Sequence, residues 1–390
     1  LRDYLNEGGK LAVTGETMGY TGFLGQTLGG IYYGLGSDPT QDCVVTDDLF
    51  GDCQLLADDF FQYYLGAFSR SSVPGPTGFT GTDDPLRGVD LTFGGPGLAA
   101  NPLDEPGTFI PTSSILPVEQ FPQFRSWGSG TYRFGSGGSG AADPYAPSEG
   151  SWYVGEPHVD DAYARLTRTV DLTSVVAAQS PRLTFDLSYD TEPGYDNVLV
   201  EARTVGSDDW TTMPDLNGLS DNTVPDECEE GFLVEEHPHL AHYLTVDEAG
   251  CSASGTTGQW YRFTGNSGGW RNVAVDLAAW AGRQVEISIS YVSDGASGGV
   301  GVFVDRTALT LNRSAAESEG FESGLGPWTV PGAPDGSPGN VIDFTRAQHL
   351  LSAAVSTPDT VLLGFGLEQV DGAASVKQAV ASVKVLLGRK

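Results

Sequence analysis

The stretch Leu183-Thr184-Phe185-Asp186-Leu187-Ser188-Tyr189 alternates apolar and polar side chains without a break. Successive side chains of a β-strand point to opposite faces, so this alternation predicts a strand with one buried and one solvent-facing side. The same period of two recurs in residues 198–202, 273–277, 285–291 and 300–304. Turn-forming Gly, Asp, Ser and Pro separate these segments. The sequence therefore predicts a β-sandwich over residues 146–315.

The two ends of the chain have a different pattern. Apolar residues at helical spacing predict helices over 1–5, 55–68 and 373–387, and short apolar runs predict strands over 10–15 and 360–366. Each end alone is too small to cover both faces of a sheet. We therefore expect one α/β domain in two parts that share a sheet, with the all-β sandwich inserted between them.

These patterns give four segments. Residues 1–70 form the first part of the α/β domain, and 316–390 form a return segment with the closing strand and helix. Residues 71–145 form a Gly/Pro-rich connection with short strands, and 128–146 are expected to be a flexible link. The sandwich occupies 146–315.

Charge and composition exclude several function classes. The 390 residues contain 20 Lys and Arg against 51 Asp and Glu, a net charge of −31, which argues against nucleic acid and anionic membranes as partners. No long apolar run predicts a membrane span. The chain begins at Leu1 without an initiator Met or a signal sequence. We expect it to be part of a longer polypeptide.

The four cysteines form two locally spaced pairs. In a secreted protein we expect disulfides between Cys43 and Cys53 and between Cys228 and Cys251. Free thiols remain the alternative. A four-cysteine zinc site would need C-x₂₋₄-C spacing, which the chain lacks.

Several stretches resemble secreted bacterial metallopeptidases. The central ones are GSWYVG (150–155), LTRTVDL (166–172), YDTEPGYD (189–196), EARTVG (201–206), DDWTT (208–212), HLAHY (239–243), YVSD (291–294) and GVFVD (301–305). They are similar to the jelly-roll module of immune inhibitor A-type peptidases and of large zinc carboxypeptidases. The flanks LRDYLNEGGK (1–10), SSILP (113–117) and LLGFGLE (362–368) resemble the region that follows the carboxypeptidase domain. The resemblance covers almost the whole chain and is most specific through residues 150–310.

The resemblance implies an accessory, non-catalytic C-terminal region of a secreted, extracellular zinc carboxypeptidase. Its partner would be the upstream peptidase domain of the same polypeptide, which would hold the zinc. The α/β part resembles a class I glutamine-amidotransferase-like domain, here partial. Amidotransfer needs a cysteine nucleophile, and a Cys43–Cys53 disulfide would consume both candidates, so we expect a structural version of that fold.

Catalytic motifs are weak in this chain. None of the five histidines is followed three residues later by Glu, so the family's H-x-x-E zinc motif is missing and we expect no peptidase activity from the chain itself. Ser267 and Ser297 fit G-x-S-x-G, but no helix is predicted after either, as a nucleophile elbow requires. His237, His239 and His242 are either a zinc-binding cluster or solvated loop residues.

Carboxylates on sandwich loops make calcium the candidate structural cofactor. Asp190, Glu192 and Asp196 surround the Pro193-Gly194 turn, and Asp305 is predicted to end a strand, where related jelly rolls often place a ligand. Arg306 follows Asp305 where a second Asp would strengthen the match. The alternative is a solvated acidic turn.

Tryptophans raise a second function class. Flat indole rings can stack on sugars, although packing against a sheet is their commoner role. The candidates are Trp152, Trp210, Trp260, Trp270 and Trp280. A stand-alone extracellular module that binds carbohydrate or protein is therefore the alternative to an accessory region, and an enzyme in its own right is the third class.

Overall fold

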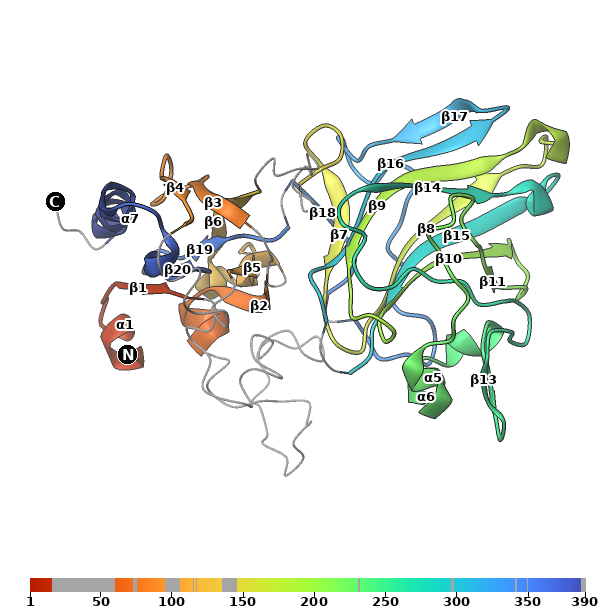
Figure 1. Ribbon diagram of the computed structural model, residues 1–390, viewed down its shortest axis with the longest axis horizontal. Helices are drawn as coiled ribbons and strands as arrows, with labels where there is room; N and C mark the ends of the chain where they lie inside the picture. The colour runs from red at the N-terminus through yellow and green to blue at the C-terminus, as the bar shows by residue number, and fades with distance from the viewer. Residues whose placement is uncertain are drawn as a thin grey trace. The chain divides into compact units, whose positions relative to one another are not determined.

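The computed structural model describes residues 1–15, 60–72, 76–94, 106–114, 116, 118–134, 146–230, 232–295, 298–340, 342–348 and 350–386. The chain divides into two compact units (Figure 1). Unit 1 comprises Leu1–Asp143 with Leu351–Lys390, and unit 2 comprises Pro144–Leu350. Unit 2 is thus inserted within unit 1, as the sequence predicts.

The sandwich of unit 2 is built from two large antiparallel sheets. The first has the order β14 (Arg271–Asp276), β9 (Arg182–Asp190), β16 (Gly301–Leu311), β7 (Tyr153–Pro157) and β18 (Thr345–Ala347), with β17 (Ser314–Glu319) also paired to β16. The second has the order β11 (Thr211–Thr212), β10 (Asn197–Thr204), β15 (Gln284–Val292) and β8 (Tyr163–Asp171). The five strands predicted from alternation are confirmed.

The apolar residues of both sheets form one core. Leu187 of β9, Val200 of β10 and Ile287 of β15 are fully buried in the same cluster. Burying one such side chain contributes roughly 1.5–3 kcal/mol. The core thus follows directly from the period-two pattern, because each strand sends every second residue inward.

The sandwich extends beyond the predicted boundary at residue 315. Phe321, Trp328 and Phe344 lie in its core, and β18 pairs with β7. The assignment of 316–350 to the α/β domain is therefore wrong. These apolar residues are isolated among Gly and Pro and show no period, so they gave no sequence indication of a sheet.

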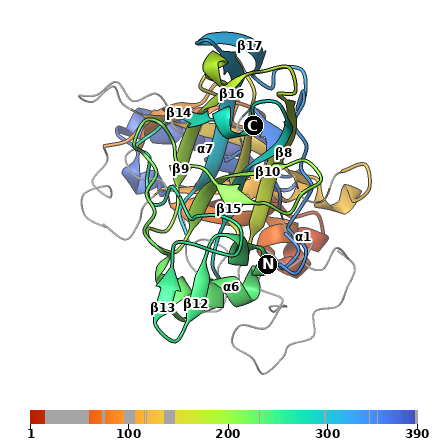
Figure 2. The same ribbon diagram turned by 90° about the vertical axis from the view of Figure 1, so that its right-hand side faces the viewer.

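A disulfide-linked segment covers the outer face of the second sheet. It contains α5 (Asp226–Glu230), α6 (Phe232–Glu236), the 3₁₀ turn η6 (Pro238–His242), β12 (Thr245–Asp247) and β13 (Gly250–Ser252), which lie together in Figure 2. A second apolar cluster joins this segment to the sheet through Leu199, Tyr163 and Trp260.

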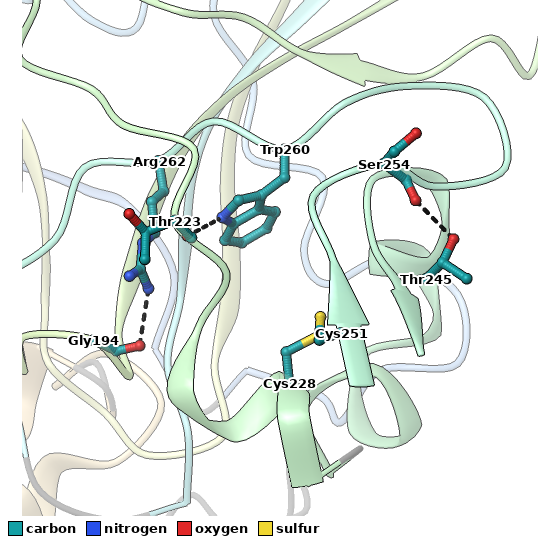
Figure 3. Close-up of a disulfide and its surroundings, with 8 residues drawn as sticks. All are labelled: Gly194, Thr223, Cys228, Thr245, Cys251, Ser254, Trp260 and Arg262. Atoms are coloured by element: carbon teal, nitrogen blue, oxygen red, sulfur yellow. Dashed lines mark hydrogen bonds between the residues drawn. A yellow bond between two sulfur atoms is a disulfide. The ribbon is translucent and has the colours of Figure 1, made fainter. Parts of the chain in front are cut away.

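The predicted pair Cys228 and Cys251 forms a disulfide within this segment (Figure 3). Nearby, the Trp260 indole N–H donates to the carbonyl of Thr223 at 2.9 Å. The disulfide therefore joins α5 to β13 within the segment, and buried Trp260 packs in the cluster that joins the segment to the sheet. Cys43 and Cys53 lie outside the described residues.

The main sheet in the described part of unit 1 is mixed. Its order is β1 (Leu11–Thr14), β20 (Thr360–Leu363), β19 (Ala354–Ser356), β6 (Trp127–Phe134), β3 (Pro76–Gly81) and β4 (Asp90–Thr92), and β2 (Ala67–Ser72) pairs separately with β5 (Gly107–Pro111). β1 lies parallel to β20, with Leu11 opposite Thr360, so the two ends of the chain share a sheet as predicted. The helices α1 (Arg2–Asn6) and α7 (Ala373–Leu386) match the predicted terminal helices. No helix of the described residues could cross a membrane.

Unit 1 is richer in β-structure than predicted. Residues 71–145 supply strands β3, β4 and β6 to the main sheet, and β6 covers part of the predicted flexible link. Gly128 and Gly130 misled the prediction: a Cβ at Gly128 would strike Ser352, and a Cβ at Gly130 would strike the Phe79 ring. These glycines allow close packing of a strand.

The predicted helix over 55–68 is also wrong in its described part. Phe60–Tyr64 forms a single π-helical turn, and the chain then enters β2 at Ala67. Phe61 and Ala67 are buried in one cluster with Phe109 and Leu362. Tertiary packing of these aromatic residues outweighs the helical spacing of the local sequence.

The disulfide generates a prediction. Replacing both Cys228 and Cys251 by Ser should lower the free energy of unfolding of unit 2 by about 3 kcal/mol, because the bond closes a loop with a sequence separation of 23. Urea unfolding followed by tryptophan fluorescence measures this. The matched variant C43S/C53S should leave the unit 2 transition unchanged, and detecting four free thiols in the unreduced chain would contradict both predicted pairs.

Candidate functional site

Loops at one end of the sandwich bring together many acidic side chains. Pro157 at the end of β7 and Asp190 at the end of β9 both lie opposite Gly301. In the other sheet, Val292 at the end of β15 lies opposite Asn197 and Tyr163. The segments 158–162, 191–196 and 293–295 therefore leave the sheets at the same end.

Seven carboxyl groups and one imidazole interact there, and we call this group the acidic end. Its members are His158, Asp160, Asp161, Glu192, Asp196, Glu227, Glu236 and Asp294. Glu227 and Glu236 come from α5 and α6, so the disulfide-linked segment contributes to the group. Negative charge is therefore concentrated far beyond what one imidazole can neutralise.

Asp196 and His158 form the buried side of the acidic end. Asp196 is fully buried, and its Oδ2 accepts hydrogen bonds from the Tyr291 hydroxyl at 2.8 Å and the Glu192 amide at 3.0 Å. His158 Nδ1 lies 2.7 Å from the Tyr291 oxygen, and its Nε2 lies 3.0 Å from Asp160 Oδ1. Burial raises the pKa of Asp196 to about 6, against the opposing charge of His158.

His158 is placed to carry a proton. Burial lowers its pKa, but the hydrogen bond to Asp160 and the charges of Asp196 and Asp160 outweigh burial and raise the pKa overall. A protonated ring would donate from Nδ1 to Tyr291 and from Nε2 to Asp160. Its two ring nitrogens thus join Tyr291 to Asp160.

Glu227 and Glu236 pair with carboxyl groups instead of with cations. Burial, the charge of Asp294 and a hydrogen bond with it raise the pKa of Glu227 to about 7. Burial, the charge of Asp161 and a hydrogen bond with it raise the pKa of Glu236 to about 7. A carboxyl group that lies near another carboxyl group keeps its proton to a higher pH, because two neighbouring negative charges repel each other.

Asp305 lies apart from the other three predicted calcium ligands. Glu192 and Asp196 lie at the acidic end, and Asp190 lies opposite Gly301 at the edge of the turn. Asp305 lies opposite Asp186, four residues along β9 from Asp190. At about 3.4 Å per residue that separation is roughly 14 Å, too far for one ion.

Asp305 has its own protein donors. β16 does not end there as expected but continues through a bulge to Leu311. Asp305 Oδ2 accepts from the Ser148 and Glu149 amides at 2.9 and 3.0 Å, and Oδ1 accepts from the Arg306 amide at 2.7 Å. The Arg306 guanidinium donates to neighbouring Asp186 at 2.9 Å. Arginine supplies the positive charge at this place.

A further buried acid lies behind Asp196. Glu156 on β7 is 0% exposed, and neither of its carboxyl oxygens has a hydrogen-bond partner among the described residues. Burial, with the charges of Asp343 and Asp196, raises its pKa well above the ordinary value. Its neighbours in the strand are Gly155 and Pro157, and the local sequence gave no indication of such a role.

The predicted histidine cluster belongs to a different network. Buried Glu201 on β10 accepts hydrogen bonds from the hydroxyls of Tyr163 at 2.6 Å and Tyr243 at 2.8 Å, and from Ser290. His239 Nε2 lies 3.5 Å from Glu201 and 3.1 Å from the Tyr243 oxygen. The network therefore fastens η6 to the sheet.

Glu201 is stabilised as a carboxylate. Burial alone would raise its pKa, but the hydrogen bond and charge of His239, with the hydroxyl donors, lower the pKa to about 2. His242 instead bonds Thr257 at 2.8 Å. Burial lowers the pKa of His237 to about 4, with its Nε2 3.4 Å from the Ser293 carbonyl. The three histidines thus have separate partners.

The described serine and tryptophan candidates make packing contacts or hydrogen bonds within the fold. Ser267 Oγ donates to the Tyr189 carbonyl at 3.0 Å and accepts from the Tyr189 amide, and Ser297 lies outside the described residues. Trp210, Trp260 and Trp280 are buried. The Arg346 guanidinium lies 3.5 Å from the ring centroid of Trp152, and Trp270 donates to the Ala146 carbonyl at 2.9 Å.

No family model matches the chain, and a search of curated proteins found no significant match. Within the described residues, no three His, Cys, Asp or Glu side chains are already arranged as a metal-binding group. The acidic end is distinguished by its concentration of carboxyl groups with raised pKa values.

The carboxyl pairs generate a pH-dependent prediction. Their raised pKa values mean that the folded chain holds more protons than the unfolded chain between about pH 4.5 and 7, so folding stability falls as the pH rises through that window. E227Q/E236Q should therefore melt at a higher temperature than wild type at pH 8 in chelator, and equally at pH 5. An equal difference at both pH values would contradict the prediction.

Glu201 generates the opposite dependence. Its lowered pKa means that the carboxylate stabilises the fold above about pH 4.5 and that this stabilisation is lost as the pH falls towards 2. Glu201→Ala should lower the free energy of unfolding by about 3 kcal/mol or more at pH 7, because it leaves buried hydroxyls and His239 without their acceptor. Urea unfolding at pH 7 measures this, and a loss below about 1 kcal/mol would be inconsistent with a buried network. Glu248→Gln, at an exposed position of the same segment, is the control.

Proposed function

We propose that the chain is a non-catalytic C-terminal region of a secreted zinc-dependent carboxypeptidase, in which unit 2 stabilises the enzyme or positions it on its substrate. The resemblance through residues 150–310 supports this proposal, as does the insertion of a sandwich into a second unit. Zinc and peptide hydrolysis would belong to an upstream domain.

We assign unit 2 to the jelly-roll class and unit 1 to a partial amidotransferase-like domain. Strands distant in sequence alternate in both sheets of unit 2, as in a jelly roll. In unit 1 the parallel pair β1–β20 supports the amidotransferase-like assignment, although the other pairings are antiparallel. The Cys228–Cys251 disulfide supports an extracellular location.

The main support for the non-catalytic role is that the potentially reactive side chains are hydrogen-bonded to other groups of the fold. His158 and His239 each lie against a buried carboxylate and a tyrosine hydroxyl, and Ser267 bonds the backbone. The tyrosine hydroxyls that contact His158 and His239 belong to fully buried side chains, Tyr291 and Tyr243, which a substrate does not reach. Their polar atoms maintain the fold.

A stand-alone binding module remains the second candidate. The acidic end favours a cationic or basic partner for such a module, since seven carboxyl groups there face one imidazole. The tryptophans provide little support for sugar stacking, because three of the five candidates are buried.

The test is to isolate the native polypeptide that contains this chain and assay it with peptides whose C-terminal residue can be released. We expect zinc-dependent release that a chelator abolishes, and no release by the 390-residue chain alone with added zinc. Hydrolysis by the chain alone would refute the accessory role. A native polypeptide without a peptidase segment would favour the binding module, for which a glycan array with Trp152→Ala as the comparison variant is the next measurement.

A further inference from the structure

We propose that Asn312 is an N-glycosylation site, whose side-chain amide carries a sugar at the exposed turn between β16 and β17. The sequence Asn312-Arg313-Ser314 fits the acceptor pattern N-x-S/T, and none of the other asparagines of the chain does. This inference rests on the extracellular location in the proposed function, which the Cys228–Cys251 disulfide supports.

The acceptor lies in a tight turn of two residues. Leu311 of β16 pairs with Ser314 of β17. Asn312 and Arg313 join these strands, with φ angles of 51° and 65°. Two positive φ angles in a two-residue hairpin loop are characteristic of a type I′ turn, in which asparagine is favoured. The backbone amide of Asn312 donates to the Gln179 carbonyl at 2.6 Å, which fixes the turn against the rest of unit 2.

The motif is accessible in the folded protein. Asn312, Arg313 and Ser314 are all exposed, and the exposure continues through most of β17. Among the described strands, β17 pairs with β16 alone, and both views show it at the edge of unit 2 (Figures 1 and 2). A sugar on Asn312 can therefore extend into solvent without displacing any core side chain.

Turn formation explains the asparagine but not the serine. Asparagine tolerates the left-handed conformation better than most residues other than glycine. Ser314 already belongs to a strand and lies opposite Leu311, where the turn requires no hydroxyl. A hydroxyl two residues after the asparagine is instead what the acceptor pattern requires. The motif thus contains a residue that the turn geometry does not account for.

The modification forms one bond and breaks one. The donor is a sugar whose anomeric carbon is activated by a phosphate ester, and a transferase on the secretion route supplies it. Asn312 Nδ2 bonds to the anomeric carbon as the bond from that carbon to the phosphate oxygen breaks. The phosphate leaves with the electron pair, and Nδ2 gives up one of its two protons to a base of the transferase. No group is oxidised or reduced.

The experiment uses the native polypeptide that contains this chain, recovered from the medium of its source cells and digested with trypsin. Mass spectrometry should find the peptide that contains Asn312 heavier by a glycan, and fragmentation should place the added mass on that residue. A bare Asn312 in the secreted polypeptide overturns the proposal and leaves the extracellular location intact. A polypeptide that is found only inside the cells with a bare Asn312 contradicts both.

Matched variants, expressed in the same cells, separate the motif from the turn. Asn312→Asp tolerates the same backbone conformation but lacks Nδ2, and Ser314→Ala removes only the hydroxyl, so both should lose the glycan completely. Ser314→Thr should keep it, because N-x-T also fits the pattern. Circular dichroism checks that all three variants fold, as their exposed positions lead us to expect. Retention of the glycan in Ser314→Ala, or its loss in Ser314→Thr, overturns the assignment.

Discussion

The sheet formed by β11, β10, β15 and β8 is buried on both faces, and the rest of unit 2 depends on this constraint. Its inner face packs Val200 and Ile287 against the other sheet, while its outer face packs Leu199 and Tyr163 against the disulfide-linked segment. Polar residues on a doubly covered sheet lose water on both sides and need protein partners. Glu201 is an example, because the hydroxyls of Tyr163, Tyr243 and Ser290 and the ring of His239 take the place of water around its carboxylate.

Burial of this sheet on both faces also explains why acidic side chains lie on the loops at its end. Strands inside a two-sided core have few places for ionisable groups, so these groups gather on the loops where the strands end. The segment that covers the outer face brings Glu227 and Glu236 to the loops at that end. Carboxylates from four separate parts of unit 2 thereby become neighbours, and the overall excess of acidic residues is focused locally.

The sequence predicted what depends on local period and failed where packing alone decides. Strands such as 183–189 and 285–291 carry their own alternation, and Cys228 and Cys251 are close enough in sequence to suggest their bond. Gly128 and Gly130 indicated flexibility, although they lie in a strand where neighbouring side chains leave no room for a Cβ.

The candidate site shows the same limit. Glu192 and Asp196 were recognisable as a dense acidic turn, but the Asp160-Asp161 pair and Asp294 lie in short loops without a recognisable motif. Their proximity to α5 and α6 follows from how the covering segment returns across the sheet, which no spacing in the sequence encodes. Asp305 was misplaced because its strand continues through a bulge.

The pairing of β1 with β20 joins two strands that the ribosome synthesises at widely separated times. Leu11 and Thr360 are partners, and 360 − 11 places them 349 residues apart. At about 5 to 20 residues per second, a ribosome needs roughly 20 to 70 s to deliver the second strand after the first. During that interval the whole sandwich emerges and can fold by itself, while the first strand lacks this partner. Unit 1 is thus completed only after the whole of unit 2 has been synthesised.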